Sequence, residues 1–277
     1  IPYICWSVDS PVMELFAKSI QHPCNRIFLF DRMQYEEIAP LNPGNVFHFP
    51  LAVNVTDKQA VIQNASASDL KKFSSQVSFV GSLYTEKCPY DRLNNPPAYL
   101  TGYLNGLMEA QLKVYGYYFI EELLPDAIIE EFKSHMDHFY TYPMETFLTD
   151  CKTLAQLYIG SKITAMERIR TFDLLSRNFH VDLYTGSDTS ILPHIHNRGL
   201  AKTLTEMPII FHESKININT TSRSIRSGLP LRIFDILGCG GFVLSNYQPE
   251  LPELFTPDEE LVAYSSPEEL KELVAYY

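Results

Sequence analysis

The chain has 277 residues and a mass of 31.7 kDa, the length of roughly two ordinary domains. Its 45% hydrophobic and 20% charged residues indicate a globular protein with a sizeable core, which excludes a disordered tail, a collagen-like repeat and a small disulfide scaffold. The net charge of −11, with Lys and Arg scattered along the chain, argues against a nucleic-acid-binding protein.

The five cysteines lie far apart in the sequence and form no C-x-x-C pair. Together with the absence of a signal-peptide pattern, this predicts reduced thiols and a cytoplasmic protein. No apolar run approaches the ~18 residues that a transmembrane helix needs. The chain opens on Ile1 rather than Met, so we expect it to be part of a longer protein.

In chain order, short apolar runs alternate with helical segments, which is typical of parallel sheets covered by helices. Residues 1–53 are expected to form an incomplete N-terminal Rossmann-like domain, in which Ser10 and Pro11 begin a helix. Its expected strands cover residues 3–8, 26–30 and 46–51. Residues 54–75 are polar and are predicted to link two domains.

Residues 76–277 are expected to form a second Rossmann-like domain, with a helical insertion at about 92–160. Capping boxes predict helix starts at Thr164–Glu167 and Ser266–Glu269, and a further helix is expected from Leu229 to Leu237. The expected strands cover residues 77–80, 181–184, 215–219, 242–245 and 261–264.

The densest chemical pattern lies in residues 213–255, where a strand leads through a Ser-Gly loop into a helix. Backbone amides at that helix N-terminus, near Gly228, can bind a phosphate, and Arg232 adds a fixed positive charge. Asp235, one turn later, can accept hydrogen bonds from ribose hydroxyls. A glycine before a helix and an Arg–Asp pair are also ordinary structural features, so the spacing leaves both interpretations open.

Residues 213–270 resemble the C-terminal part of the bacterial CgeB-like glycosyltransferases, relatives of the large retaining group-1 family. The resemblance implies the GT-B architecture, in which two Rossmann-like domains face each other across a cleft that holds a nucleotide-sugar. The E-x7-E signature of that family aligns with Ser227 to Asp235, and Ile236 to Gly240 match the small-residue helix end that follows. By this alignment Asp235 binds the donor ribose, and Ser227 replaces the acid that approaches the donor sugar.

The resemblance extends more loosely over most of the chain. Gly81 and Ser82 match the glycine turn where the backbone approaches the donor phosphates. The family's usual Arg after that glycine is absent, and Lys87 is near in sequence. Gly186 and Ser187 match the next strand-end loop and are further implied donor contacts.

The remaining implied site residues surround the base and the reacting sugar. Met207 and Pro208 lie where the family's backbone usually meets the nucleobase, and Asn219 is expected near the donor sugar. Residues 1–53 would form the acceptor side, where Asp9 is the catalytic candidate at a place that holds a His in many relatives.

Other chemistries fit less well. No D-x-D motif is present, so we expect no metal at the donor diphosphate, whose charge the helix amides and a nearby arginine would offset. His135 and His138 share a helical face, and His194 and His196 lie on a loop, but neither pair has a third ligand at a recognised zinc spacing. Cys239 is interpreted as a packed small residue rather than a nucleophile.

The prediction is an α/β, GT-B-like glycosyltransferase that moves a sugar from a nucleoside diphosphate sugar to an unknown glycan, protein or small-molecule acceptor. No cofactor or metal is expected, and the resemblance implies retention of configuration. Two alternatives stay open: an inactive binding or scaffold protein, and a nucleotide-sugar epimerase on the same fold. The Ser at position 227 and the missing Arg beside Gly81 favour the first alternative, and product analysis without acceptor would reveal the second.

Overall fold

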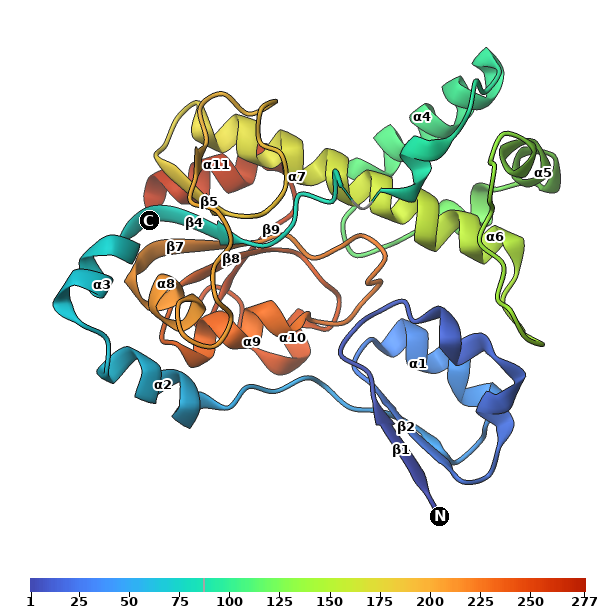
Figure 1. Cartoon of the computed structure of the whole chain (residues 1–277), viewed down its shortest axis with the longest axis horizontal. Helices are drawn as coiled ribbons and strands as arrows, with labels where there is room; N and C mark the ends of the chain where they lie inside the picture. The colour runs from blue at the N-terminus through green and yellow to red at the C-terminus, as the bar shows by residue number, and fades with distance from the viewer. Residues whose placement is uncertain (87) are drawn as a thin grey trace.

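A computed structural model describes residues 1–86 and 88–277, so Lys87 lies outside the described residues. The chain forms two separate parallel sheets, each accompanied by helices, and a group of helices beside them (Figure 1). The smaller sheet belongs to the N-terminal segment, drawn in blue, and the larger one combines a strand at residues 75–80 with strands from the C-terminal half. The expected α/β class with two parallel sheets is therefore confirmed.

The N-terminal sheet has the order β1-β2-β3, with all strands parallel. Its strands are β1 (Tyr3–Trp6), β2 (Asn25–Leu29) and β3 (Val46–His48), with α1 (Arg32–Ile38) between the last two. Ile27 and Leu29 alternate toward a small core that they share with Leu15 and Ile38. The prediction that a helix begins at Ser10 is wrong. The Ser10 hydroxyl donates to Asp31 at 2.6 Å, and the first helical turn is a 3-10 helix over Met13–Phe16.

The C-terminal sheet is parallel and has the order β6-β5-β4-β7-β8-β9. Its strands are β4 (Ser75–Val80), β5 (Val181–Tyr184), β6 (His196–Asn197), β7 (Ser214–Asn219), β8 (Val243–Asn246) and β9 (Val262–Tyr264). The chain adds β5 and β6 on one side of β4 and then crosses to β7 on the other side. In open α/β sheets this reversal leaves a crevice at the carboxyl ends of the two strands, where ligands bind.

Helices cover both faces of this sheet (Figure 1). One face packs against α8 (Met207–Glu213) and α9 (Leu231–Gly238), and the other against α7 (Gly160–Ser176) and α11 (Pro267–Tyr276). A short helix, α10 (Leu251–Leu254), follows β8. The α9 helix appears where the sequence predicts one, whereas α8 is not predicted.

The segment expected to be a polar linker forms two helices, α2 (Val55–Gln63) and α3 (Ala67–Phe73). Asn54 and Ser66 cap them by accepting hydrogen bonds from backbone amides, and both helices pack against α8. Polar capping residues in this segment therefore mark helix starts.

The two predicted capping boxes have different outcomes. Ser266 caps α11 and accepts a hydrogen bond from the Glu269 amide at 3.1 Å, as expected. Thr164 begins no helix, because a π-helical turn over Thr153–Ile159 continues directly into α7. Its hydroxyl donates to the Gly160 carbonyl at 2.8 Å, the back-bond that Thr makes inside a helix.

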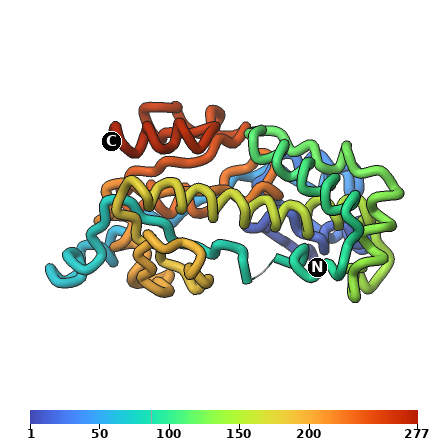
Figure 2. Tube along the Cα trace, turned by 90° about the horizontal axis from the view of Figure 1, so that it is seen from above, coloured from blue at the N-terminus to red at the C-terminus, as the bar shows by residue number. Residues whose placement is uncertain are grey.

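The expected helical insertion contains α4 (Ala98–Leu112), α5 (Asp126–Ser134) and α6 (Asp150–Lys152), packed around a core of their own. Figure 2 shows this group, in green, at the end of the molecule that also holds the N-terminal segment. The Phe147 amide donates to the Phe16 carbonyl at 2.7 Å, so the insertion is attached to the N-terminal unit. Along the described chain, no helix is both long enough and apolar enough to cross a membrane.

Two glycines offer a matched test of this packing. A Cβ at Gly241 would overlap the Phe211 carbonyl oxygen and lie 2.9 Å from Asn217 Nδ2, whereas one at Gly106, on exposed α4, would meet nothing within 4 Å. Gly241→Ala should therefore lower the free energy of unfolding by about 3 kcal/mol. Gly106→Ala should raise it by up to ~1 kcal/mol, because Ala is the better helix former. Urea denaturation measures both changes, and equal effects would contradict the packing.

Candidate functional site

The loops that follow β4 and β5 bring four predicted donor-binding residues together: Gly81, Ser82, Gly186 and Ser187. The hydroxyls of Ser82 and Ser187 both donate to the carboxylate of Glu86, each at 2.7 Å. Burial acts to raise the pKa of Glu86, but these hydrogen bonds outweigh it and lower the pKa. Two loops distant in sequence therefore meet around one carboxylate at the edge of the crevice.

Arg168 of α7 joins the two strands that flank the crevice. Its Nη1 donates to the Ser82 carbonyl at 2.5 Å, and its Nη2 donates to the Thr220 carbonyl, just after β7, at 2.7 Å. The guanidinium also lies over the Tyr84 ring, 4.8 Å from the centroid. Sequence reasoning missed Arg168, because no local pattern distinguishes it from other helical arginines.

The charge of Arg168 has no carboxylate at ion-pair distance among the residues that the structure describes. Burial lowers its pKa, and Nε has no hydrogen-bond partner within the same set of residues. Arginine has five N–H donors, of which the two carbonyls take two. A partly buried cation with unused donors therefore stands at the position where an open α/β sheet binds ligands.

A second group of predicted residues lies at the start of α9. Arg232 Nη1 is 3.6 Å from Asp235 Oδ2 and 3.7 Å from the sulfur of Met207, which is buried in α8 beside Pro208. Asp235 also pairs with Lys58 of α2, at 3.0 Å. Burial lowers the pKa of Arg232, and Asp235 offsets part of that change. The structure thus brings the predicted base, ribose and phosphate residues of α8 and α9 together.

The two arginines are electrostatically coupled, since the charge of Arg232 contributes to lowering the pKa of Arg168. Beside α9, a cavity of about 390 Å³ is lined by Asp235, by Leu231 and by residues of α2 and the segment before it. Asp235, which is predicted to bind the ribose, therefore borders this cavity.

Ser227 and Gly228 are buried in the contact between the two sheets. The Ser227 hydroxyl lies 2.8 Å from Asp31 Oδ1 and 2.7 Å from Glu250 Oε1, and its amide donates to Asp31 at 3.2 Å. A Cβ at Gly228 would come within 2.9 Å of the Phe30 carbonyl oxygen. Both residues thus hold the N-terminal unit against the C-terminal one.

Asn219, at the carboxyl end of β7, is buried below the crevice. Its side-chain amide donates to the hydroxyls of Thr221 and Ser245, at 3.0 and 2.9 Å. These bonds join the ends of β7 and β8, so the contacts of Asn219 position the loop that contains Thr220.

A cavity of about 400 Å³ lies between the two units and includes Asp9. Residues 9–14 line it from the N-terminal side, and Tyr84 and Ser224 line it from the loops after β4 and β7. Tyr84 has a φ of 67°, a left-handed conformation that bulky residues rarely adopt. Its ring lies against the Arg168 guanidinium, so Tyr84 borders both the cavity and this cation. Tyr84 and Ser224 were not predicted as site residues.

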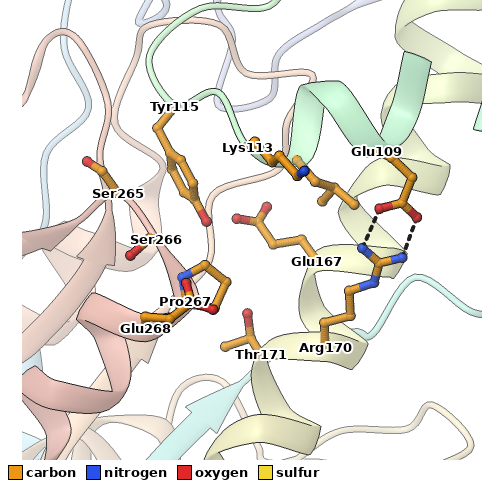
Figure 3. Close-up of a pocket in the computed structure, with 11 residues that line it drawn as sticks. Glu109, Lys113, Tyr115, Glu167, Arg170, Thr171, Ser265, Ser266, Pro267 and Glu268 are labelled. Carbon is orange, nitrogen blue, oxygen red and sulfur yellow. Dashed lines mark hydrogen bonds and ion pairs between the residues drawn. The ribbon is translucent and has the colours of Figure 1, made fainter. Parts of the chain in front are cut away.

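Figure 3 shows another cavity, of about 370 Å³, where the insertion meets α7 and α11. Glu167 points into it near Tyr115, and Arg170 pairs with Glu109 at its side. Glu167 forms a buried bidentate ion pair with Arg223, with both distances 2.7 Å. None of the predicted site residues lines this cavity.

The cysteines are consistent with a structural role. All five are free thiols. Burial raises the pKa of Cys239 to about 11, so this thiol is protonated at neutral pH. The geometry therefore supports a packed small residue at position 239.

Ser227→Ala tests the contact between the two units. The change removes a hydroxyl that both buried carboxylates use, and should lower the free energy of unfolding by about 2 kcal/mol. The matched control is Ser190→Ala, since this exposed hydroxyl bonds to Asp188 of its own loop; the change should alter stability by less than ~0.5 kcal/mol. If both variants unfold like the wild type, Ser227 does not hold the units together.

The match to a protein-family model lies in the C-terminal half of the chain. Residues 161–277, from α7 to α11, match a family model described as "Glycosyl transferase-like". A crystal structure of Anabaena HepE in complex with UDP and glucose aligns with a TM-score of 0.44 and 9% sequence identity, over 99% of this chain and 61% of that one. The comparison with curated protein sequences found no match. The matched segment, residues 161–277, contains α9 and the Arg168 side of the crevice.

Proposed function

We propose that this chain belongs to a GT-B glycosyltransferase of the CgeB-like branch, which moves a sugar from a nucleoside diphosphate sugar to an acceptor hydroxyl. The C-terminal sheet would bind the donor and the N-terminal unit would face the acceptor. The matched domain, residues 161–277, supports the reaction class, and the crevice between β4 and β7 supports the position of the donor.

One observation carries this proposal: the partly buried charge of Arg168 at the crevice, whose Nε atom is buried. A guanidinium with unused donors and without a carboxylate partner among the described side chains is stabilised by binding an anion. Arg232 adds a second, partly compensated cation nearby. We assign both arginines and the backbone at Gly81 and Ser82 to the diphosphate, and Asp235 to the ribose.

The proposed chemistry uses these charges on the leaving group. The bond between the sugar C1 and the diphosphate oxygen breaks, the acceptor oxygen bonds to C1, and the departing diphosphate takes the acceptor's proton. Fixed guanidinium groups favour this step, because they face the negative charge that develops on the diphosphate. We propose that the arginines neutralise this charge without a metal ion and that the sugar keeps its anomeric configuration.

The cavity between the two units is the proposed acceptor site. Asp9 lines it from the N-terminal side, and Tyr84 separates it from Arg168. An acceptor hydroxyl held there would lie next to the proposed diphosphate position, with Asp9 available to orient it.

A binding protein without transferase activity is the second candidate. The hydrogen bonds of the Ser227 hydroxyl with Asp31 and Glu250 favour this candidate. Ser227 stands where the family has its first acid, and here its hydroxyl is engaged in the contact between the two units. Incubation with a labelled donor separates the cases: a glycosylated acceptor supports the transferase, an epimerised donor supports an epimerase, and an unchanged donor supports the binding protein.

The donor site is tested by calorimetric titration with UDP, GDP, ADP and CMP, with and without magnesium. We expect one nucleoside diphosphate to bind, with an affinity that magnesium does not change. Arg168→Met and Asp235→Ala should each weaken binding by at least ~10-fold, which corresponds to ~1.4 kcal/mol.

The control for Arg168→Met is Arg177→Met, because Arg177 is an exposed arginine at the end of the same helix and pairs with Asp173 of that helix. This variant should bind like the wild type. Thermal unfolding of each variant confirms that it is folded. Equal binding by the wild type and by Arg168→Met, or no binding of any nucleotide by the wild type, would contradict the proposal.

A further inference from the structure

Two histidines and an aspartate converge at the outer edge of the C-terminal sheet. His180 and Asp182 are two residues apart in an extended segment, so their side chains project to the same side. His196 pairs directly with Asp182 in the register of β5 and β6. The ligating atoms of all three residues lie within 4.8 Å of one another.

The carboxylate at the centre of this cluster is buried, with 1% of the Asp182 side chain exposed. Its Oδ1 lies 2.6 Å from His196 Nδ1 and 3.6 Å from His180 Nε2. Its Oδ2 accepts a hydrogen bond from the Ser75 hydroxyl. The two imidazoles are about half exposed, so the cluster is open to solvent on one side and anchored on the other.

We propose that His180, Asp182 and His196 form a binding site for a divalent transition metal, with zinc as the ion that fits best. Two imidazole nitrogens and one carboxylate oxygen are ligands that zinc accepts, and three protein ligands leave a fourth tetrahedral position for water. The hydrogen bond from Ser75 to the far oxygen of Asp182 is the outer contact that orients such a ligand. None of its three ligands is a proposed donor contact.

Arg198 is the one nearby group that opposes the cation within the described chain. Its Nη1 lies 3.6 Å from Asp182 Oδ1, while its Nη2 donates to the Lys72 carbonyl at 2.6 Å. The backbone contact directs part of the guanidinium away from the cluster. Removal of the Arg198 charge should strengthen metal binding, because the guanidinium repels a cation bound at Asp182. A purely structural role of the histidines predicts no such change.

A bound ion would link β6 to β5 through coordinate bonds to His196 and Asp182, in addition to the hydrogen bonds of a two-residue edge strand. The loop between these strands contains Gly186 and Ser187, which are proposed donor contacts. The metal would act as a structural clamp on this loop, and take no part in the transfer step.

Titration of the metal-free protein with Zn²⁺ tests the site, with calorimetry and native mass spectrometry as readouts. We expect one zinc per chain, and a weakening of at least ~10-fold in His196→Ala and in His180→Gln. The matched control is His194→Ala, an exposed histidine two residues from His196 that is outside the cluster; it should bind zinc like the wild type. Arg198→Gln should bind zinc more tightly than the wild type.

Because His180 and His196 are exposed, their variants should fold, and thermal unfolding in a chelator verifies this. Failure of the wild type to bind zinc, or equal losses in His194→Ala and His196→Ala, would overturn the metal site. Neither result bears on nucleotide binding, which is measured in separate titrations without zinc.

Discussion

The guanidinium of Arg168, bound to two backbone carbonyls, is the interaction on which the candidate site depends. It reaches from α7 to the carbonyls after β4 and β7, which are separated from it by 86 and 52 residues in sequence. In this parallel sheet the order of strand addition switches sides at β4, which leaves the ends of β4 and β7 apart, and Arg168 joins them. The same side chain supplies the positive charge for an anion, so the architecture and the proposed chemistry share one residue.

The contact between the two sheets determines how the rest of the site is arranged. Asp31 and Glu250 are both buried and converge on Ser227, while the insertion is attached to the same N-terminal unit through the Phe16 carbonyl. These contacts hold residues 9–14 opposite the loops after β4 and β7 and leave the cavity between them. The proposed acceptor space is therefore a consequence of the domain contact.

Much of the fold could be predicted from the sequence, because buried parallel strands are short apolar runs and α9 follows a recognisable loop. Local patterns failed where the outcome depends on distant partners. Thr164 has the spacing of a cap but lies inside a continuous helix, and Ser10 bonds to Asp31 rather than to a helix N-terminus. Arg168 and the partners of His196 were missed for the same reason: their roles arise only when segments far apart in sequence meet.

A crystal structure of the protein with the nucleoside diphosphate that binds most tightly would test the role of Arg168 most directly. We expect diphosphate oxygens within hydrogen-bond distance of the Arg168 or Arg232 guanidinium, beside the loop at Gly81 and Ser82. A nucleotide bound in the cavity of Figure 3, or anywhere else away from both arginines, would contradict it.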